Sequence, residues 1–168
     1  SMGGGSTNFI GGITNTSDRQ WTLFAMNATN GQSIWLRNIA SPQGQGSPAD
    51  QPAVAVSGTN LFVTGTGVGG SAQFGAINLS WPENLRQYFA RYDTNGTAQL
   101  ATTYGSETVF PWTAVADASG NVYVGGDFDT YARFGSNIIA GYRKANIGGS
   151  NPGQTFVAKF DRNGNSLW

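Results

Sequence analysis

The chain has 168 residues, 39% of them apolar and 12% aromatic, which is enough apolar surface to bury a core. Its nine basic and nine acidic residues give a net charge of zero, so nucleic acid is not expected as a partner, and no apolar run is long enough for membrane insertion. Cysteine and histidine are both absent, which excludes disulfides, thiol nucleophiles and most zinc sites, and no cofactor is expected.

The first forty residues are expected to hold a linker and an incomplete first repeat. Residues 1–7 have the composition of a cloning remnant and linker. A strand is predicted over residues 8–12, and another in the segment 23–31, which alternates apolar and polar residues before it reaches Asn30-Gly31. Because Asn and Gly tolerate positive φ, a tight hairpin turn is predicted there, with a return strand over 33–39.

This hairpin recurs twice further along the chain. Segments 88–96 and 156–164 align with 23–31 without gaps, and their return strands are predicted over 98–104 and 165–168. Each return places a large apolar residue four positions after the turn glycine: Trp35, Leu100 and Trp168. The shared position predicts a shared core role, with Trp35 and Trp168 packing between neighbouring repeats.

A second hairpin lies ahead of the later two copies. Residues 52–65 align with 113–126, each with a turn rich in Gly, Ser and Asn. The chain therefore reads as eleven strands in three repeats, over 8–39, 52–104 and 112–168, with one strand missing from the first. Long surface loops are predicted over 66–86 and 129–154, and each contains a Phe-Gly pair.

Two strings, SGNVYVGGDF at 119–128 and TFVAKFDRNGNSLW at 155–168, resemble the bacterial β-propeller repeats called SBBP. The resemblance covers roughly residues 8–168. Residues 24–31 with Trp35 are more loosely similar to the docking motif of quinoprotein-type propeller repeats, with Ala28 in place of that family's Asp. The resemblance implies an all-β chain of about three blades, each a four-stranded antiparallel sheet, and an extracellular or cell-surface location in bacteria. It implies no chemistry.

The candidate ligand-binding residues are Trp81, Trp112, Asp127 and Asp129. Both tryptophans lie beside prolines and have no counterpart in the other copies, and an aromatic face can stack on a sugar ring. The two aspartates occupy alternate positions at a strand end, with Asp117 predicted nearby on the neighbouring strand, and could hold calcium or polarise a sugar. The alternative is a solvated strand end without a ligand.

Asp93 and Asp161 each precede an Asn-Gly pair, a pattern that could suggest calcium loops. Since Ala28 stands at the same position of the first copy and the turn sequence persists, hairpin chemistry is the favoured interpretation. No metal is expected.

The sequence predicts a non-enzymatic propeller repeat module that serves as scaffold, adhesion or interaction surface. The alternative is a carbohydrate-binding propeller, and a fragment of a glycosidase or quinoprotein-like enzyme is disfavoured. Three blades do not close a ring, so self-association is expected to cover the open faces, either as a homodimer with six blades or through further blades of the parent protein. Glycans are the other partner class considered.

Overall fold

The computed structural model describes residues 8–10, 13–15, 21–40, 52–67, 70–80, 87–106, 109–141 and 153–168. Within these ranges the chain is all-β, as predicted, and contains no helix that could cross a membrane. The strands are β1 (Asn8–Ile10), β2 (Ile13–Asn15), β3 (Trp21–Met26), β4 (Ser33–Ala40), β5 (Ala53–Ser57), β6 (Asn60–Thr66), β7 (Ser71–Phe74), β8 (Ile77–Ser80), β9 (Gln87–Tyr92), β10 (Ala98–Tyr104), β11 (Val109–Ala116), β12 (Val122–Phe128), β13 (Tyr131–Phe134), β14 (Asn137–Ala140) and β15 (Gln154–Phe160).

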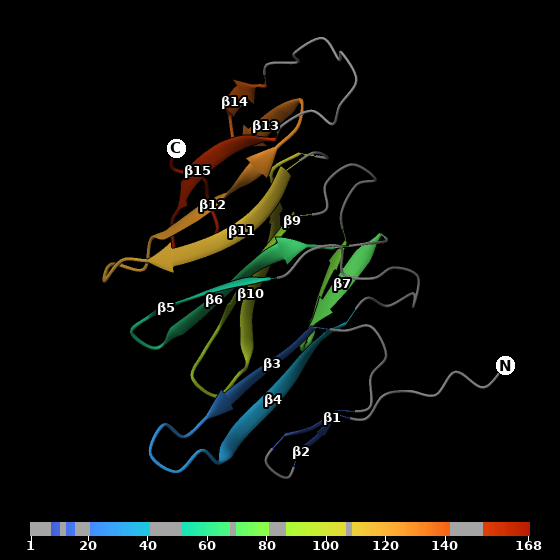
Figure 1. Ribbon diagram of the computed structural model, residues 1–168, viewed down its shortest axis with the longest axis vertical. Coiled ribbons are helices and arrows are strands. Elements are labelled where there is room, and N and C mark those ends of the chain that lie inside the picture. Colours follow the sequence, from blue (N-terminus) through green and yellow to red (C-terminus); the bar gives the residue numbers. More distant parts are fainter. Residues whose placement is uncertain are drawn as a thin grey trace, which may run out of the picture.

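Three larger antiparallel sheets follow one another along the longest axis of the molecule (Figure 1). The first sheet has the order β3-β4-β7-β8, the central sheet β10-β9-β6-β5, and the third sheet β11-β12-β15. A bridge between Phe160 and Ser166 adds part of the predicted last strand to the third sheet. In the described part of the chain none of these sheets closes on itself.

The central sheet is covered on both faces, which explains why every residue of β9 except Arg91 is buried. Tyr88, Ala90 and Tyr92 belong to the core shared with the first sheet, whereas Phe89 belongs to the core shared with the third. Because successive side chains of a strand point to opposite faces, both kinds of position are apolar here. The two cores thus join three sheets face to face.

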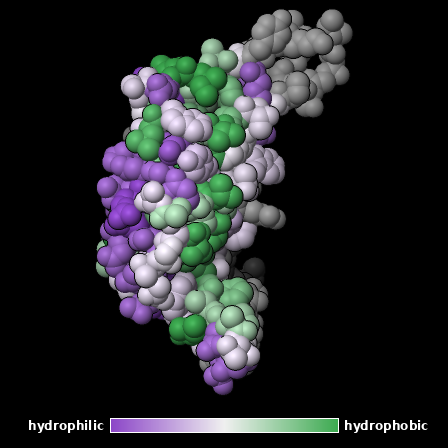
Figure 2. All heavy atoms as spheres, turned by 90° about the vertical axis from the view of Figure 1, so that its left-hand side faces the viewer, coloured by the Kyte–Doolittle hydropathy of each residue, from purple (hydrophilic) through white to green (hydrophobic). Residues whose placement is uncertain are grey.

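The hairpin turns place polar side chains in solvent. Seen from the side that faces the turns, hydrophilic side chains gather along one edge of the molecule and hydrophobic ones form a band beside them (Figure 2). A band of apolar side chains is therefore left at the surface.

Aspartate carboxylates organise three of the turns. In the central sheet the Oδ1 atom of Asp93 accepts the backbone N–H groups of Asn95 and Thr97, both at 2.9 Å. Asp117 and Asp161 do the same four residues ahead of Asn121 and Asn165. The hairpin interpretation of Asp93 and Asp161 is therefore confirmed, but the Asn-Gly pair does not fill the two central positions of the turn. Gly96 is instead the last residue of the turn: its N–H donates a hydrogen bond to the Asp93 carbonyl, and its φ is 72°.

The gapless alignment of the first copy is wrong by one position. Leu23 pairs with Arg37, while Phe89 pairs with Thr102, and these two partners stand equally far from their turn glycines. Leu23, and not Phe24, is therefore the counterpart of Phe89. The reason is local: Ala28 has no side-chain acceptor, so the Asn27 side chain accepts the N–H of Thr29, and the turn gains one residue.

Both predicted long loops contain a hairpin. In residues 66–86 the strands β7 and β8 pair with each other, and β7 also pairs with β4, so they extend the first sheet. In residues 129–154 the strands β13 and β14 form the equivalent hairpin, with Phe134 packed against Tyr104. The first hairpin thus contacts β4, and the second contacts β10. The other difference is at the start, where β1 pairs with β2 and, among the described residues, not with β3.

We expect Gly96→Ala to destabilise the chain more than the matched control Gly58→Ala. Both glycines have positive φ, which costs any side chain roughly 1 to 2 kcal/mol. Only at Gly96 would the new Cβ also collide, 2.7 Å from the Trp35 ring, whereas Gly58 has nothing within 4 Å. Urea unfolding should give a loss of about 1 kcal/mol for Gly58→Ala and about 2 to 4 for Gly96→Ala. Equal losses would mean that Trp35 does not lie on the turn.

Candidate functional site

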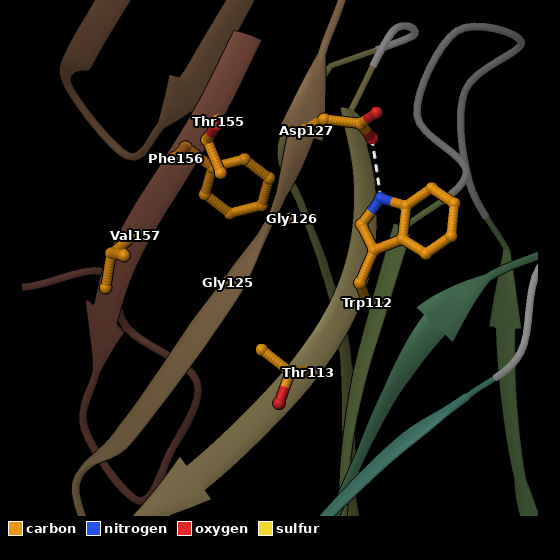
Figure 3. Close-up of a pocket in the computed structure, with 8 residues that line it drawn as sticks. All are labelled: Trp112, Thr113, Gly125, Gly126, Asp127, Thr155, Phe156 and Val157. Atoms are coloured by element: carbon orange, nitrogen blue, oxygen red, sulfur yellow. Dashed lines mark hydrogen bonds between the residues drawn. The ribbon is translucent and has the colours of Figure 1, made fainter. Parts of the chain in front are cut away.

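The described residues contain a shallow, open depression of about 400 Å³ on the third sheet (Figure 3). Strands β11, β12 and β15 all contribute to it, and its lining is almost wholly apolar. The lining residues are Trp112, Thr113, Gly125, Gly126, Asp127, Thr155, Phe156 and Val157.

Trp112 and Asp127 are the two predicted site residues that the structure brings together. Trp112 is 66% exposed, and its indole Nε1 donates a hydrogen bond of 2.6 Å to the Asp127 carboxylate. The contact arises from a bulge: Phe110 pairs with Asp127 and Thr113 with Gly125, so the extra residue between them places the indole beside the carboxylate. The hydrogen bond fixes one edge of the ring and leaves its face open.

The floor of the depression exists because two successive residues lack side chains. Gly125 and Gly126 lie on the middle strand, between Trp112 on one side and Phe156 on the other (Figure 3). At Gly126 a Cβ would lie 2.1 Å from the Phe110 carbonyl oxygen, so packing requires glycine there. The alignment with Thr64-Gly65 of the central sheet was visible in the sequence, but it gave no sign of a depression.

The other predicted site residues do not join this pair. Asp129 is exposed in the bend after β12, and Trp81 lies outside the described residues. Asp117 caps the turn at one end of the hairpin β11 and β12, whereas Asp127 pairs with Phe110 at the other end. Asp117 lies opposite Asn121, six residues before Asp127, so at about 3.3 Å per residue the two backbone positions are roughly 20 Å apart along the strand. That separation does not suit a pair of carboxylates flanking one glycosidic bond.

The face of the third sheet that is turned away from the central sheet carries several exposed apolar side chains, together with Lys159; we call it the outer face. Register pairing puts Val115, Tyr123 and Lys159 on it, and the neighbouring pairs put Thr113, Gly125 and Val157 there. The ring of Trp168 meets Tyr123 edge-on at 6.1 Å between centroids. Prediction and structure agree for Trp35, which is buried between sheets, but Trp168 is 54% exposed. The depression is thus one part of a larger apolar surface.

Three buried tyrosines lie outside this surface. Burial raises the pKa of the Tyr88 and Tyr104 hydroxyls well above the ordinary value and raises the pKa of Tyr92 to about 12. All three hydroxyls therefore stay protonated near neutral pH and are unsuited to act as bases.

Acid is expected to weaken the turns. The Asn121 side chain lowers the pKa of Asp117 by hydrogen bonding. At Asp161, burial opposes the shift, but hydrogen bonds from the side chain and backbone of Asn165 and from Asn163 leave the pKa lowered. A folded pKa below the unfolded value of about 3.9 gives stability that is present above that pH and lost as the pH falls through the folded pKa.

The variant Asp161→Asn tests this directly, because Asn27 makes the equivalent contact in the first hairpin without a charge. We expect the variant to keep its fold at pH 7 but to lose less stability than the parent chain between pH 5 and pH 2. Urea midpoints measured across that range give the comparison. An unchanged loss would assign the acid sensitivity to other groups.

Comparison with known proteins provides no assignment, since no family model and no curated protein matches the chain.

Proposed function

We propose that the chain is a non-enzymatic repeat module, a run of propeller-like blades that forms part of the scaffold or adhesion surface of a secreted or cell-surface bacterial protein. In this proposal the first, central and third sheets are successive blades. The proposal depends on one observation, which is that at two successive junctions the turn glycine of one sheet packs against side chains of the sheet before it.

At both junctions a turn glycine lies against side chains of the preceding sheet, although these side chains do not occupy equivalent positions. The ring of Trp35 lies against Gly96, and Thr102 with Phe89 lies against Gly164. Arginines add to both junctions: Arg37 donates to the Asn95 carbonyl at 2.9 Å, and Arg91 donates to the Arg162 carbonyl at 3.2 Å. A module that repeats one junction can be extended by further copies, which suits a scaffold.

Two experiments test the proposal. A panel of chromogenic glycosides should remain unhydrolysed, and hydrolysis that disappears in Asp127→Asn would contradict the non-enzymatic part. An antibody against the chain should label intact cells of the source bacterium. Labelling only after permeabilisation would contradict the surface location.

The second candidate is carbohydrate binding at the depression. The exposed face of Trp112, which is held in place by Asp127, favours this candidate. An indole face can stack on a sugar ring, and the carboxylate can accept hydrogen bonds from the sugar hydroxyls. A glycan array should then give a signal that Trp112→Ala removes without changing the melting temperature, because the side chain is exposed. An array without signal from the parent chain would reject this candidate.

A further inference from the structure

Residues on the outer face of the third sheet are exposed, whereas the residues at the equivalent positions of the central sheet are buried. Val157 is 59% exposed, whereas its counterpart Phe89 is 0% exposed and contacts Phe160 of the third sheet at 5.8 Å between ring centroids. Tyr123 likewise corresponds to the buried Phe62. The junction between the central and third sheets is therefore a template for what would cover the outer face.

Trp168 makes the template more specific. It stands four residues after a turn glycine, as Trp35 does. Trp35 Nε1 donates to the carbonyl of Thr94 at 2.8 Å, and its ring packs on Gly96 of the following turn. By analogy, Trp168 requires a turn of the same kind presented by the neighbour.

The first sheet offers a related turn, one residue longer than the turn at Gly96, and an apolar face beside it. Residues 27–31 form an exposed turn ending at Gly31, with a φ of 70°. Phe24 and Met26, each 48% exposed, lie on the side of β3 away from Leu23, which packs toward the central sheet. By the corrected register they correspond to Ala90 and Tyr92, the residues with which the central sheet covers its predecessor. The net charge of zero adds no repulsion between copies.

We propose that the chain associates head to tail with a second copy, the outer face of its third sheet docking on the Phe24 and Met26 face of the partner's first sheet. Trp168 then packs on the turn 27–31 of that copy, as Trp35 packs on the turn of the central sheet. The inference rests on the proposed function, because it treats each sheet as one unit of a continuing array. Such an interface is heterologous, so it closes into a ring or adds copies in a row.

Sedimentation velocity over a concentration series tests the proposal with two variants, Val157→Asp and Phe24→Asp. Each changes an exposed side chain, so both should fold, which circular dichroism melting verifies. The parent chain should associate, each variant alone should be monomeric, and an equimolar mixture of the two should form a heterodimer through the one intact pair of faces. Trp168→Ala should weaken association by on the order of tenfold or more. Ile138→Asp, on exposed β14, is the control and should leave association unchanged.

Three results would overturn the proposal: a parent chain that stays monomeric, a Phe24→Asp chain that associates as the parent does, or a mixture of folded variants that stays monomeric. The second result would indicate that two copies pair through the outer face alone. None of these results bears on glycoside turnover or cell-surface labelling, so the proposed function fails or stands on its own experiments.

Discussion

Replacing Trp35 by Ala is expected to lower the free energy of unfolding by about 3 to 5 kcal/mol, the usual cost of deleting a buried large aromatic side chain. Trp35 is 8% exposed and belongs to the core between the first and central sheets. Its indole Nε1 also donates to the Thr94 carbonyl, so the substitution removes both packing and a hydrogen bond across the junction. Urea unfolding monitored by circular dichroism gives the measurement.

Two further variants separate the contributions. Trp35→Phe keeps an aromatic ring but not the donor, so its loss should be smaller than that of Trp35→Ala. Trp168→Ala removes the repeat counterpart, and in dilute solution it should change stability by less than about 1 kcal/mol because the ring is half exposed. A Trp35→Ala loss as small as that of Trp168→Ala would contradict the burial of Trp35 at the junction.

Phe89→Ala should be about equally damaging, again at about 3 to 5 kcal/mol. Phe89 is fully buried between the central and third sheets, and its ring contacts Phe62 within its own sheet and Phe160 in the next. The cavity left by its removal would lie in the middle of the stack, where neither sheet can collapse without moving the other.

The matched control is Val157→Ala, at the equivalent position of the third sheet. Because Val157 lies on the outer face, we expect a loss below about 1 kcal/mol. The test is the difference in unfolding free energy lost between Phe89→Ala and Val157→Ala. Similar losses at Phe89 and Val157 would contradict the burial of Phe89 between two sheets and the exposure of Val157 on the outer face.

Local patterns in the sequence predicted most strands but not their exact register. Alternating apolar residues and turn glycines were enough to place the strands near Phe89, Phe62 and Phe160, because such patterns follow directly from the pleat. The one-residue shift at Leu23 was missed because the repeated Asn-Gly pair fixed the alignment. The side chain that caps that turn belongs to Asn27, and its role becomes clear only from the hydrogen bonds.

The two inserted hairpins were missed although each pairs with itself locally, because the contacts that hold them against the sheets come from residues distant in the sequence. Phe74 pairs with Ile39 within the first sheet, and Phe134 packs on Tyr104 of the central sheet. A signal was present: Phe74-Gly75 and Phe134-Gly135 recur and are followed by apolar residues at Ile77 and Ile138. The glycines nearby led to the prediction of surface loops for both segments.

The candidate site was predictable in part. Trp112 was selected because it lies beside a proline and has no repeat counterpart, and Asp127 was selected as one of a pair of acidic residues. Their hydrogen bond depends on the bulge between Pro111 and Thr113, for which the sequence offers only the proline as a hint. The glycine floor and the contribution of Phe156 depend on strand pairing and were not predicted.

The relative rate at which a thiol reagent labels Ala90→Cys and Val157→Cys tests the stacking of the sheets most directly. The chain contains no cysteine, so each variant carries a single reactive group. Ala90 is fully buried against the first sheet, and Val157 lies on the outer face. At a concentration where the chain is monomeric, labelling at position 157 should approach the rate of a free thiol, whereas labelling at position 90 should be limited by the rate of unfolding. Equal rates at the two positions under native conditions would contradict the stacked arrangement.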